Sequence, residues 1–301
     1  MPLAREHLHE EDWLALVSSR DQDDDPLFGS QVRAEFSALR ERIAQMTPEG
    51  ISGLRVAEPS ADRQKDHPPL IRLDEISCQF DESVALNKVS LEINQGEIVS
   101  ITGGDGSGKT SLFKTICGLE NLASGSVYFS GLDISRMPAD KRIYTGIVHV
   151  PEGRQVFGPM SVEDNILLGS YSRKMDASVY SDLESLYDLV PVLRQKRNMM
   201  AGSLNQGEQQ LLAIARGLMA KPKLLLIDEP YSGLSPDQVG DISRIIRRLK
   251  KEGVTLIITE PKSGFASEIA DRQLFMQSGE IVDLENNARG VSADSDLEML
   301  A

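Results

Sequence analysis

A glycine-rich stretch that ends in a lysine and a hydroxyl side chain is the strongest chemical signal in this 301-residue chain. From Gly103 to Thr110 it fits the pattern G-x-x-x-x-G-K-[ST]. Glycine lets successive backbone N–H groups turn toward a phosphate, while the lysine reaches the outer phosphates and the hydroxyl binds Mg²⁺. The stretch therefore predicts a nucleoside triphosphate site. The residues expected to contact the nucleotide are Gly103, Gly104, Asp105, Gly106, Ser107, Gly108, Lys109, Thr110 and Ser111.

The segments on either side of this loop have the character that a phosphate-binding loop requires. Residues 97–102 are apolar and β-branched, as in a buried strand. Residues 111–119 have helical spacing up to Gly118, a typical helix end. A chance match in a glycine-rich turn is the alternative, and it requires neither flank. The order of strand, loop and helix therefore favours phosphate binding.

Two adjacent carboxylates, Asp228 and Glu229, follow the fully apolar run 224–227. Acidic side chains at the end of a buried strand are costly without a partner, so a cation or a phosphate-bound water is expected beside them. Asp228 would hold Mg²⁺ directly or through water, and Glu229 would polarise the water that attacks the γ-phosphate. A helix cap at the strand end is the alternative.

Composition and charge limit the class of protein. The chain is 40% hydrophobic and 26% charged, has no run of 18 apolar residues, and lacks a signal-peptide core in its first ten residues. Cys78 and Cys117 have no metal-ligand spacing, so we expect buried, reduced thiols in a cytosolic protein. The net charge is −14, of which residues 1–66 carry −6 and residues 280–301 carry −5. These acidic ends serve solubility and argue against nucleic acid as a partner.

The sequence divides into an extension, a core and a tail. Residues 1–66 are the predicted acidic extension, and apolar spacing predicts an amphipathic helix over residues 31–46 that packs either on its own domain or on a partner. Residues 47–69 are proline-rich, as in a linker. The predicted core spans residues 67–285, and residues 286–301 form the predicted acidic tail.

Strand and helix patterns alternate along the core, which indicates an α/β fold. Residues 161–220 are expected to be largely helical with Ser161 as an N-cap, and residues 239–251 to form a basic helix. The end of the core, residues 273–282, has the pattern of a hairpin around Ser278 and Gly279. The predicted strands are 71–77, 89–93, 125–131, 147–150, 224–227 and 254–258.

A third segment, Leu204–Leu218, begins with the run L-N-Q-G-E-Q-Q. Together with the two motifs above, it makes the chain resemble the ATP-binding cassette (ABC) ATPases, whose signature usually reads L-S-G-G-E-Q-Q at the start of a helix. The resemblance covers about residues 70–285. It implies a P-loop NTPase (RecA-like) core, an antiparallel β subdomain, and a helical subdomain at about residues 155–220.

The resemblance also assigns further site residues. Phe80 matches the aromatic residue that stacks on adenine, although a phenylalanine that only fills its strand is the alternative. The signature would bind the ATP of the other subunit through Asn205, Gln206, Gly207 and Glu208. The residues implied for catalysis are Lys109 and Glu229, and those implied for Mg²⁺ are Thr110, Glu152 and Asp228.

Two segments, Val150–Phe157 and Val162–Gly169, resemble the ATPases of branched-chain amino-acid importers and their urea-type relatives. The resemblance implies two cassettes, identical or different, that sandwich two ATP molecules and drive an integral membrane permease between inward- and outward-facing states. Residues 152–170 would contact that permease. The implied location is cytoplasmic, peripheral on the inner face of the cell membrane.

The chain departs from the family pattern at four positions. Asn205 and Gln206 replace the signature Ser and Gly, and Ser235 stands where many cassettes have Asp. Pro261 replaces the switch His or Gln, and because proline has no side-chain donor the loss could cost about 2–4 kcal/mol of transition-state stabilisation. We therefore expect slow hydrolysis at this chain's own site and a different, intact cassette as its partner.

Three functions are compatible with these observations. The first is the ATPase subunit of a membrane importer, favoured by residues 150–169. The second is a degenerate cassette that binds ATP for regulation or assembly, favoured by Pro261 and the extension 1–66. The third, a small-molecule kinase or another phosphate-loop enzyme, leaves the segment Leu204–Leu218 unexplained.

Overall fold

The structure is a computed structural model, and it describes residues 68–80, 83–173, 177–262 and 264–282. The predicted extension 1–66 with its helix 31–46, and the predicted tail 286–301, lie outside the described residues. The predicted domain boundaries therefore stay predictions.

Both cysteines, Cys78 and Cys117, are free and buried, and burial raises the pKa of the Cys117 thiol to about 12.

An antiparallel sheet of four strands comes first, in the order β2-β1-β4-β5. Strand β1 pairs on one edge with β2 and on the other with β4, so that Leu73 lies between Leu91 and Val127. The strands are longer than the predicted runs 71–77 and 89–93, because paired backbone continues through the polar positions toward the connecting turn. Their bounds are β1 Ile71–Phe80, β2 Ser83–Ile93, β4 Ser124–Phe129 and β5 Leu132–Asp133.

A second sheet has six strands in the order β10-β9-β3-β8-β7-β6, and all except β10 run parallel. Every residue of β3, β7 and β8 is buried, which confirms the fully apolar runs as central strands. The predicted hairpin is also present, with Ser278 and Gly279 at positive φ between β9 and β10. The bounds are β3 Ile98–Thr102, β6 Ile147–Val150, β7 Leu224–Ile227, β8 Thr255–Glu260, β9 Arg272–Gln277 and β10 Glu280–Val282.

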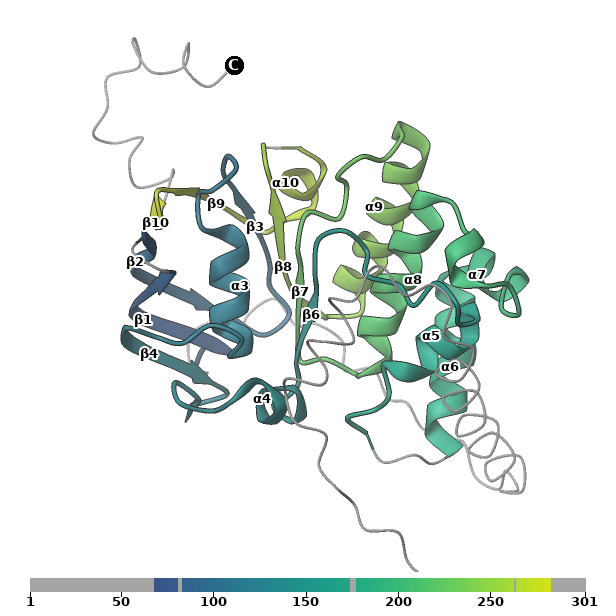
Figure 1. Ribbon diagram of the computed structural model, residues 1–301, viewed down its shortest axis with the longest axis horizontal. Helices are drawn as coiled ribbons and strands as arrows, with labels where there is room; N and C mark the ends of the chain where they lie inside the picture. The colour runs from purple at the N-terminus through teal and green to yellow at the C-terminus, as the bar shows by residue number, and fades with distance from the viewer. Residues whose placement is uncertain (1–67, 81–82, 174–176, 263, 283–301) are drawn as a thin grey trace, which may run out of the picture. The chain divides into compact units, whose positions relative to one another are not determined.

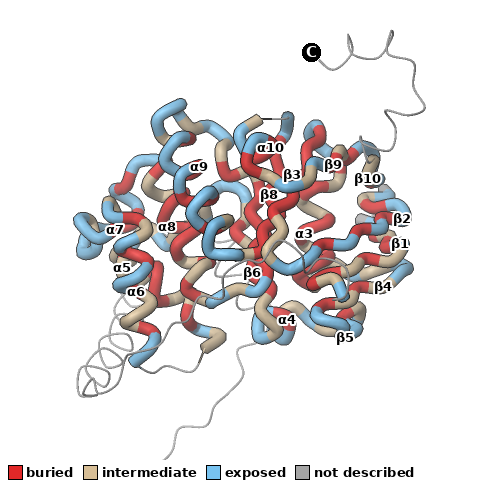
Figure 2. The backbone as a smooth tube through the Cα atoms, turned by 180° about the vertical axis from the view of Figure 1, so that it is seen from behind, coloured by how far each residue is buried: buried red, intermediate tan, exposed pale blue. Residues whose placement is uncertain are grey.

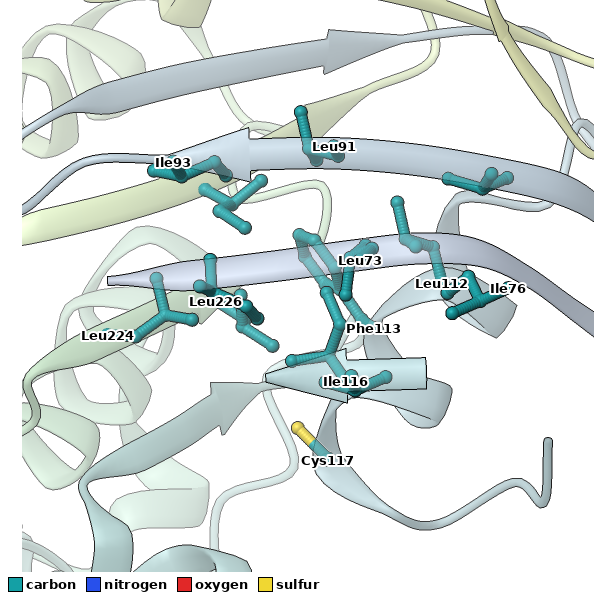
Figure 3. Packing of buried hydrophobic residues seen from close by; sticks show 14 of the residues in the cluster. Leu73, Ile76, Leu91, Ile93, Leu112, Phe113, Ile116, Cys117, Leu224 and Leu226 are labelled. Atoms are coloured by element: carbon teal, nitrogen blue, oxygen red, sulfur yellow. The ribbon is translucent and has the colours of Figure 1, made fainter. Parts of the chain in front are cut away.

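Helix α3 (Lys109–Cys117) lies between the two sheets, whereas α8 (Gln206–Met219) and α9 (Pro236–Lys251) cover the opposite face of the parallel sheet (Figure 1). The largest apolar side chains on the buried face of α3 are Leu112, Phe113 and Ile116. Figure 3 shows these side chains packed against β1, β2 and the strand β7. Figure 2 shows buried residues concentrated on the strands and on the helix faces turned toward them.

The predicted helical region contains several short helices beside α8. Helix α5 (Val162–Leu168) has Ser161 as its N-cap, whose Oγ accepts a hydrogen bond from the Asp164 N–H at 3.0 Å, as predicted. Helix α9 begins three residues before the predicted start, because Ser235 and Gln238 form a capping box ahead of it. The other helices within the described residues are α4 Ala139–Thr145, α6 Ala177–Leu189, α7 Pro191–Gln195, η1 Ala201–Ser203 and α10 Phe265–Ile269.

Candidate nucleotide site

The predicted motifs meet at the carboxyl edge of the parallel sheet. Strand β3 ends at Thr102 before the glycine loop, β7 ends before Asp228, and β8 ends at Glu260. The pairing of β3 with β8, and of β8 with β7, aligns these ends. Parallel strands carry their carboxyl ends to the same edge, so the glycine loop and the carboxylate pair, separated by more than 100 residues, become neighbours.

The glycine loop joins β3 directly to the start of α3. The Gly103 N–H donates to the Glu260 carbonyl at 3.2 Å, which ties the loop to β8. Gly106 and Gly108 have φ values of 74° and 106°, a left-handed conformation that glycine adopts without strain. Gly108 caps α3 without a side chain, and no acidic residue lies in the first helical turn. The first N–H groups of α3 therefore face a position suited to an anion.

Lys109 is almost fully buried, with an exposed fraction of 5%. Its Nζ donates to the carbonyl oxygens of Gly103 at 2.6 Å and Gly104 at 3.1 Å. The same ammonium lies 3.4 Å from the Glu229 Oε1 atom. The lysine charge is thus held against the carbonyls of its own loop and beside the second motif, where it would face bound phosphates.

Asp228 and Thr110 come together from different motifs. The Thr110 Oγ1 atom donates to Asp228 Oδ2 at 2.9 Å, and the Asp228 side chain is buried. A hydroxyl and a carboxylate oxygen side by side fit Mg²⁺, which commonly takes one or two protein oxygens and completes its shell with phosphates and water. Among the residues described, no group of three or more His, Cys, Asp or Glu side chains could hold a metal ion.

Glu229 has an unusual backbone and a perturbed carboxyl group. Its φ is 45°, in the left-handed region, and its N–H donates to the Thr259 Oγ1 atom at 3.0 Å. Burial raises the pKa of Glu229, the Lys109 ammonium opposes that shift, and the negative charge of Glu152 adds to it. Glu152 itself lies exposed in the turn after β6. Its charge acts on Glu229, and its predicted role as a metal ligand stays a prediction.

The hairpin between β9 and β10 is hydrogen-bonded to the glycine loop. The Gly279 N–H donates to the Ser107 carbonyl at 2.9 Å, and the Gly279 carbonyl accepts from the Asn87 N–H at 2.9 Å. The loop is therefore fastened to strand β2 through a turn near the end of the described chain. The Ser107 Oγ atom is buried and has no hydrogen-bond partner within the described residues, which leaves it available to a ligand oxygen.

The signature segment begins helix α8, as predicted. Asn205 is the N-cap, its Oδ1 accepts the Glu208 N–H at 3.0 Å, and the Glu208 carboxylate accepts the Asn205 N–H at 3.2 Å. The same carboxylate pairs with Lys196 at 2.6 Å. Asn205 and Gln206 are exposed, whereas Gly207 is buried. The segment therefore presents the start of a helix to solvent.

The Gln238 side chain of helix α9 contacts the start of α8. The Gln238 Nε2 atom donates to Asn205 Oδ1 at 3.2 Å, and a Cβ atom on Gly207 would lie 2.7 Å from the Gln238 side chain. A side chain at Gly207 would therefore require the Gln238 side chain to move. Asn205 already accepts two hydrogen bonds through Oδ1, so its amide NH₂ group is the part that remains to contact a partner.

For two predicted site residues, Phe80 and Pro261, the structure gives the place in the fold but no contact within the site. Phe80 is the last residue of β1 and its backbone pairs with Ser83, but its side chain lies outside the described residues. Pro261 is exposed in the bend that follows β8.

In the importer-like segment 150–169, the side-chain amide of the buried Asn165 is hydrogen-bonded to the backbone of Phe157. The amide accepts the Phe157 N–H at 2.9 Å and donates to the Phe157 carbonyl at 3.0 Å.

Sequence reasoning missed three residues that build the site. Thr259 contacts both carboxylate residues, Gly279 holds the glycine loop, and Gln238 covers the signature glycine. A threonine at the end of an otherwise apolar run was the one signal available for Thr259. The other two depend on contacts between distant segments, which periodicity does not record.

The fold and the site define a nucleotide-binding protein of the phosphate-loop class, with a lysine, a hydroxyl and two carboxylates gathered at the ends of parallel strands. Comparison with known proteins narrows that class. The family described as ABC transporter matches residues 86–232. The chain belongs to the ABC transporter family and is one of its ATP-binding subunits.

Several relatives cover nearly the whole cassette. The chain is 38% identical over 213 residues to the high-affinity branched-chain amino acid transport ATP-binding protein BraG of Pseudomonas aeruginosa, covering 71% of this chain and 91% of that protein. It is 31% identical to the probable branched-chain amino acid transport ATP-binding protein LivF of Archaeoglobus fulgidus, covering 70% and 90%. It is 32% identical to the glutamine transport protein GlnQ of Geobacillus stearothermophilus, covering 71% and 89%.

Solved structures agree with the fold. The ADP conformation of MJ1267, an ATP-binding cassette of an ABC transporter, has a TM-score of 0.65 and 27% identity, covering 77% of this chain and 98% of that chain. The dimeric structure of MJ0796, a bacterial ABC transporter cassette, has a TM-score of 0.63 at 24% identity and supports the fold alone. Within the described ranges, none of the helices combines the length and the apolar character needed to cross a lipid bilayer.

Proposed function

We propose that this chain binds Mg²⁺-ATP and couples its hydrolysis to solute import through a separate membrane permease, as a peripheral subunit on the cytoplasmic face. One observation carries the proposal. Lys109, which belongs to the glycine loop, lies 3.4 Å from Glu229, while Thr110 of the same loop lies 2.9 Å from Asp228. Four groups suited to phosphate, metal and water are thereby brought to one point.

Each group has a distinct role in the proposed reaction. The N–H groups of the glycine loop and the Lys109 ammonium bind and orient the phosphates, while Thr110 and Asp228 hold Mg²⁺, with Glu152 at the edge of the site. Bound Mg²⁺ would neutralise charge on the phosphate oxygens. Glu229 orients the attacking water and accepts its proton, which its raised pKa favours once the carboxylate is ionised. Phe80 would stack on the adenine.

The proposed solute class is amino acids. BraG and LivF are named for branched-chain amino acid transport, and GlnQ for glutamine transport. The segment 150–169, which resembles importer ATPases, supports the same proposal. Residues 152–170 would contact the permease, and Phe157 is partly exposed there beside Arg216, whose guanidinium lies 5.2 Å from the ring centre.

We further propose a heterodimer with slow turnover at this chain's own site. ABC cassettes work as dimers, and in that arrangement Asn205 and Gln206 would face the ATP of the partner cassette. Both positions are exposed and differ from the usual signature. Pro261 offers no side-chain donor where a His or Gln usually contacts the γ-phosphate. A different cassette with intact motifs would supply the faster site.

A binding experiment on the purified full chain tests the first part of the proposal. We expect Lys109→Ala to weaken Mg²⁺-ATP binding about 100-fold, because a buried charge-assisted contact to phosphate is lost. The matched control is Lys114→Ala, a lysine of the same helix that is 44% exposed and paired with Glu120. Equal loss in both variants, or none in Lys109→Ala, contradicts a phosphate role for Lys109.

A second experiment separates binding from turnover and identifies partners. Glu229→Gln should keep ATP binding while abolishing hydrolysis at this site. The chain alone should turn over ATP well below about 1 s⁻¹, the lower end of typical enzyme rates. Purification of the native complex should recover a permease and a different cassette. A fast homodimer, or a complex with only one kind of cassette, overturns the heterodimer.

A further inference from the structure

Thr259 occupies a position in the site that no motif assigns. Its side chain is fully buried at the end of β8, the strand that lies between β3 and β7. The Oγ1 atom donates to Asp228 Oδ1 at 2.5 Å and accepts the Glu229 N–H at 3.0 Å. One hydroxyl is therefore bonded to both residues of the carboxylate pair.

Strand register explains how the hydroxyl reaches both partners. Ile258 lies opposite Ile227, so Thr259 follows beside Asp228, and on its other edge Thr259 pairs with Ile101 at the end of β3. The residues before it in β8 are apolar from Leu256 to Ile258. A valine would have nearly the same shape here but could not satisfy either polar partner.

The two hydrogen bonds of Thr259 have different effects on Asp228 and on Glu229. With Oδ1 of Asp228 bound to Thr259, Oδ2 points to Thr110, and the carboxylate is held in one rotamer. The bond to the Glu229 N–H supports a residue whose φ of 45° is unfavourable for a side chain larger than glycine. Without the hydroxyl, that partly buried N–H and one oxygen of the buried Asp228 would both lose their partner.

We infer that Thr259 is a positioning residue for Mg²⁺-ATP hydrolysis, acting through Asp228 on the metal and through Glu229 on the attacking water. The inference rests on the proposed function. It makes the Thr259 hydroxyl a further requirement for hydrolysis, in addition to the glycine loop and the two carboxylates. A misplaced Asp228 weakens the response to Mg²⁺, and a misplaced Glu229 slows the chemical step without changing how the nucleotide itself binds.

The test compares Thr259→Val with Thr259→Ser in the full chain. Nucleotide binding is followed with a fluorescent ATP analogue, first without Mg²⁺ and then in a Mg²⁺ titration. We expect Thr259→Val to bind the analogue within about twofold of wild type without Mg²⁺, and to need about tenfold more Mg²⁺ for half-saturation, the usual scale for a lost outer-shell partner. Its kcat should fall at least tenfold while KM for ATP changes less than threefold. Thr259→Ser should recover most of both losses.

Thr255→Val is the matched control. Thr255 begins the same strand, is also buried, and its Oγ1 accepts the Gly96 N–H at 2.8 Å, far from the carboxylates. This variant loses a buried hydrogen bond of the same kind, so it should lower the unfolding temperature without raising the Mg²⁺ requirement. Equal changes in both valine variants, or a serine variant no better than valine, overturn the inference.

The outcomes also separate this inference from the proposed function. If the wild-type chain, alone and with its partners, binds no nucleotide, the proposed function fails. If wild type binds and hydrolyses ATP but Thr259→Val keeps the wild-type Mg²⁺ requirement and kcat, only the positioning role fails. If hydrolysis by wild type is too slow to measure, the Mg²⁺ titration alone decides for or against Thr259.

Discussion

Two neighbouring glycines of the phosphate loop serve different purposes. A Cβ atom on Gly103 would lie 2.3 Å from the Met276 carbonyl oxygen and 2.7 Å from the Ser107 Oγ atom, whereas a Cβ on Gly104 would meet nothing within 4 Å. We expect Gly103→Ala to lower the free energy of unfolding by about 1–3 kcal/mol, because a sheet carbonyl cannot easily move. Gly104→Ala should stay within about 0.5 kcal/mol of wild type.

Thermal unfolding without nucleotide is the measurement for this pair, since it excludes any effect on phosphate contacts. The two variants differ only in which glycine receives the same methyl group. Equal destabilisation would mean that the loop as a whole rejects a side chain. Gly103 would then have no special role in joining β3 to β9.

Glu260 gives a pH-dependent prediction at the same scale. Its buried carboxylate accepts the Ala266 N–H at 3.1 Å, and burial raises its pKa although N–H groups at the start of α10 oppose the shift. At pH values above the raised pKa, the ionised group is less favourable in the folded chain than in the unfolded chain, so it lowers the free energy of unfolding. That loss disappears as the pH falls through the raised pKa.

We therefore expect Glu260→Gln to unfold at a higher temperature than wild type at pH 7. The difference should shrink as the pH falls toward 4.5, the ordinary pKa of a glutamic acid. Melting curves of both proteins across this pH range give the comparison directly. A glutamine variant that is less stable by the same amount at every pH would show that the hydrogen bonds to α10 outweigh burial.

At the scale of elements, one buried arginine closes the C-terminal end of helix α3. Arg142 is 3% exposed, and its guanidinium donates to the carbonyls of Thr115 and Ile116 in the last helical turn, both at 2.7 Å. It also donates to the carbonyls of Met137 and Ser135. The cation is thus placed at the negative end of the helix dipole, and its contacts are carbonyls rather than a carboxylate.

We expect Arg142→Leu to lower the free energy of unfolding by about 3 kcal/mol or more, because several buried carbonyls lose their donor at about 1–3 kcal/mol each. Urea denaturation of the purified chain measures this. The control is Lys141→Ala on the same helix, whose side chain is 65% exposed and which should change stability by less than about 0.5 kcal/mol. A stable leucine variant would show that α4 and α3 repack without the guanidinium.

The elements themselves were largely predictable from sequence. The runs that became β3, β7 and β8 are mostly apolar, which is typical of central strands, and Gly118 ended α3 where its left-handed conformation is needed. Arg142 was not predictable as a helix cap, because its four acceptors come from segments that the sequence keeps apart. Thr259 was missed for the same reason, since its partners Asp228 and Glu229 follow the end of the neighbouring strand β7.

At the scale of the whole molecule, the altered signature gives a prediction about assembly. Asn205 caps α8, and serine is an equally good N-cap, so Asn205→Ser combined with Gln206→Gly should leave stability within about 1 kcal/mol of wild type. If these two positions limit how well the chain closes on a second copy of itself around ATP, the double variant should raise the ATP turnover of the chain alone at least tenfold.

Steady-state ATPase assays of wild type and the double variant make this comparison. The control is Asn198→Ser, the same change at an exposed position outside the signature. A double variant that binds ATP but turns over no faster than the control would place the limitation elsewhere, with Pro261 as the next position to restore.

The fastening of the phosphate loop by the β9–β10 hairpin has a consequence for biosynthesis. Strand β3 leaves the ribosome more than 150 residues before β8 and β9, the two strands that flank it in the sheet. The nascent loop lacks both the Glu260 carbonyl and the Gly279 N–H until nearly the whole cassette has been translated. The phosphate loop is thus translated early, but its supporting contacts form only after the last strands have been made. We therefore expect a nascent chain to bind nucleotide only when synthesis of the cassette has finished.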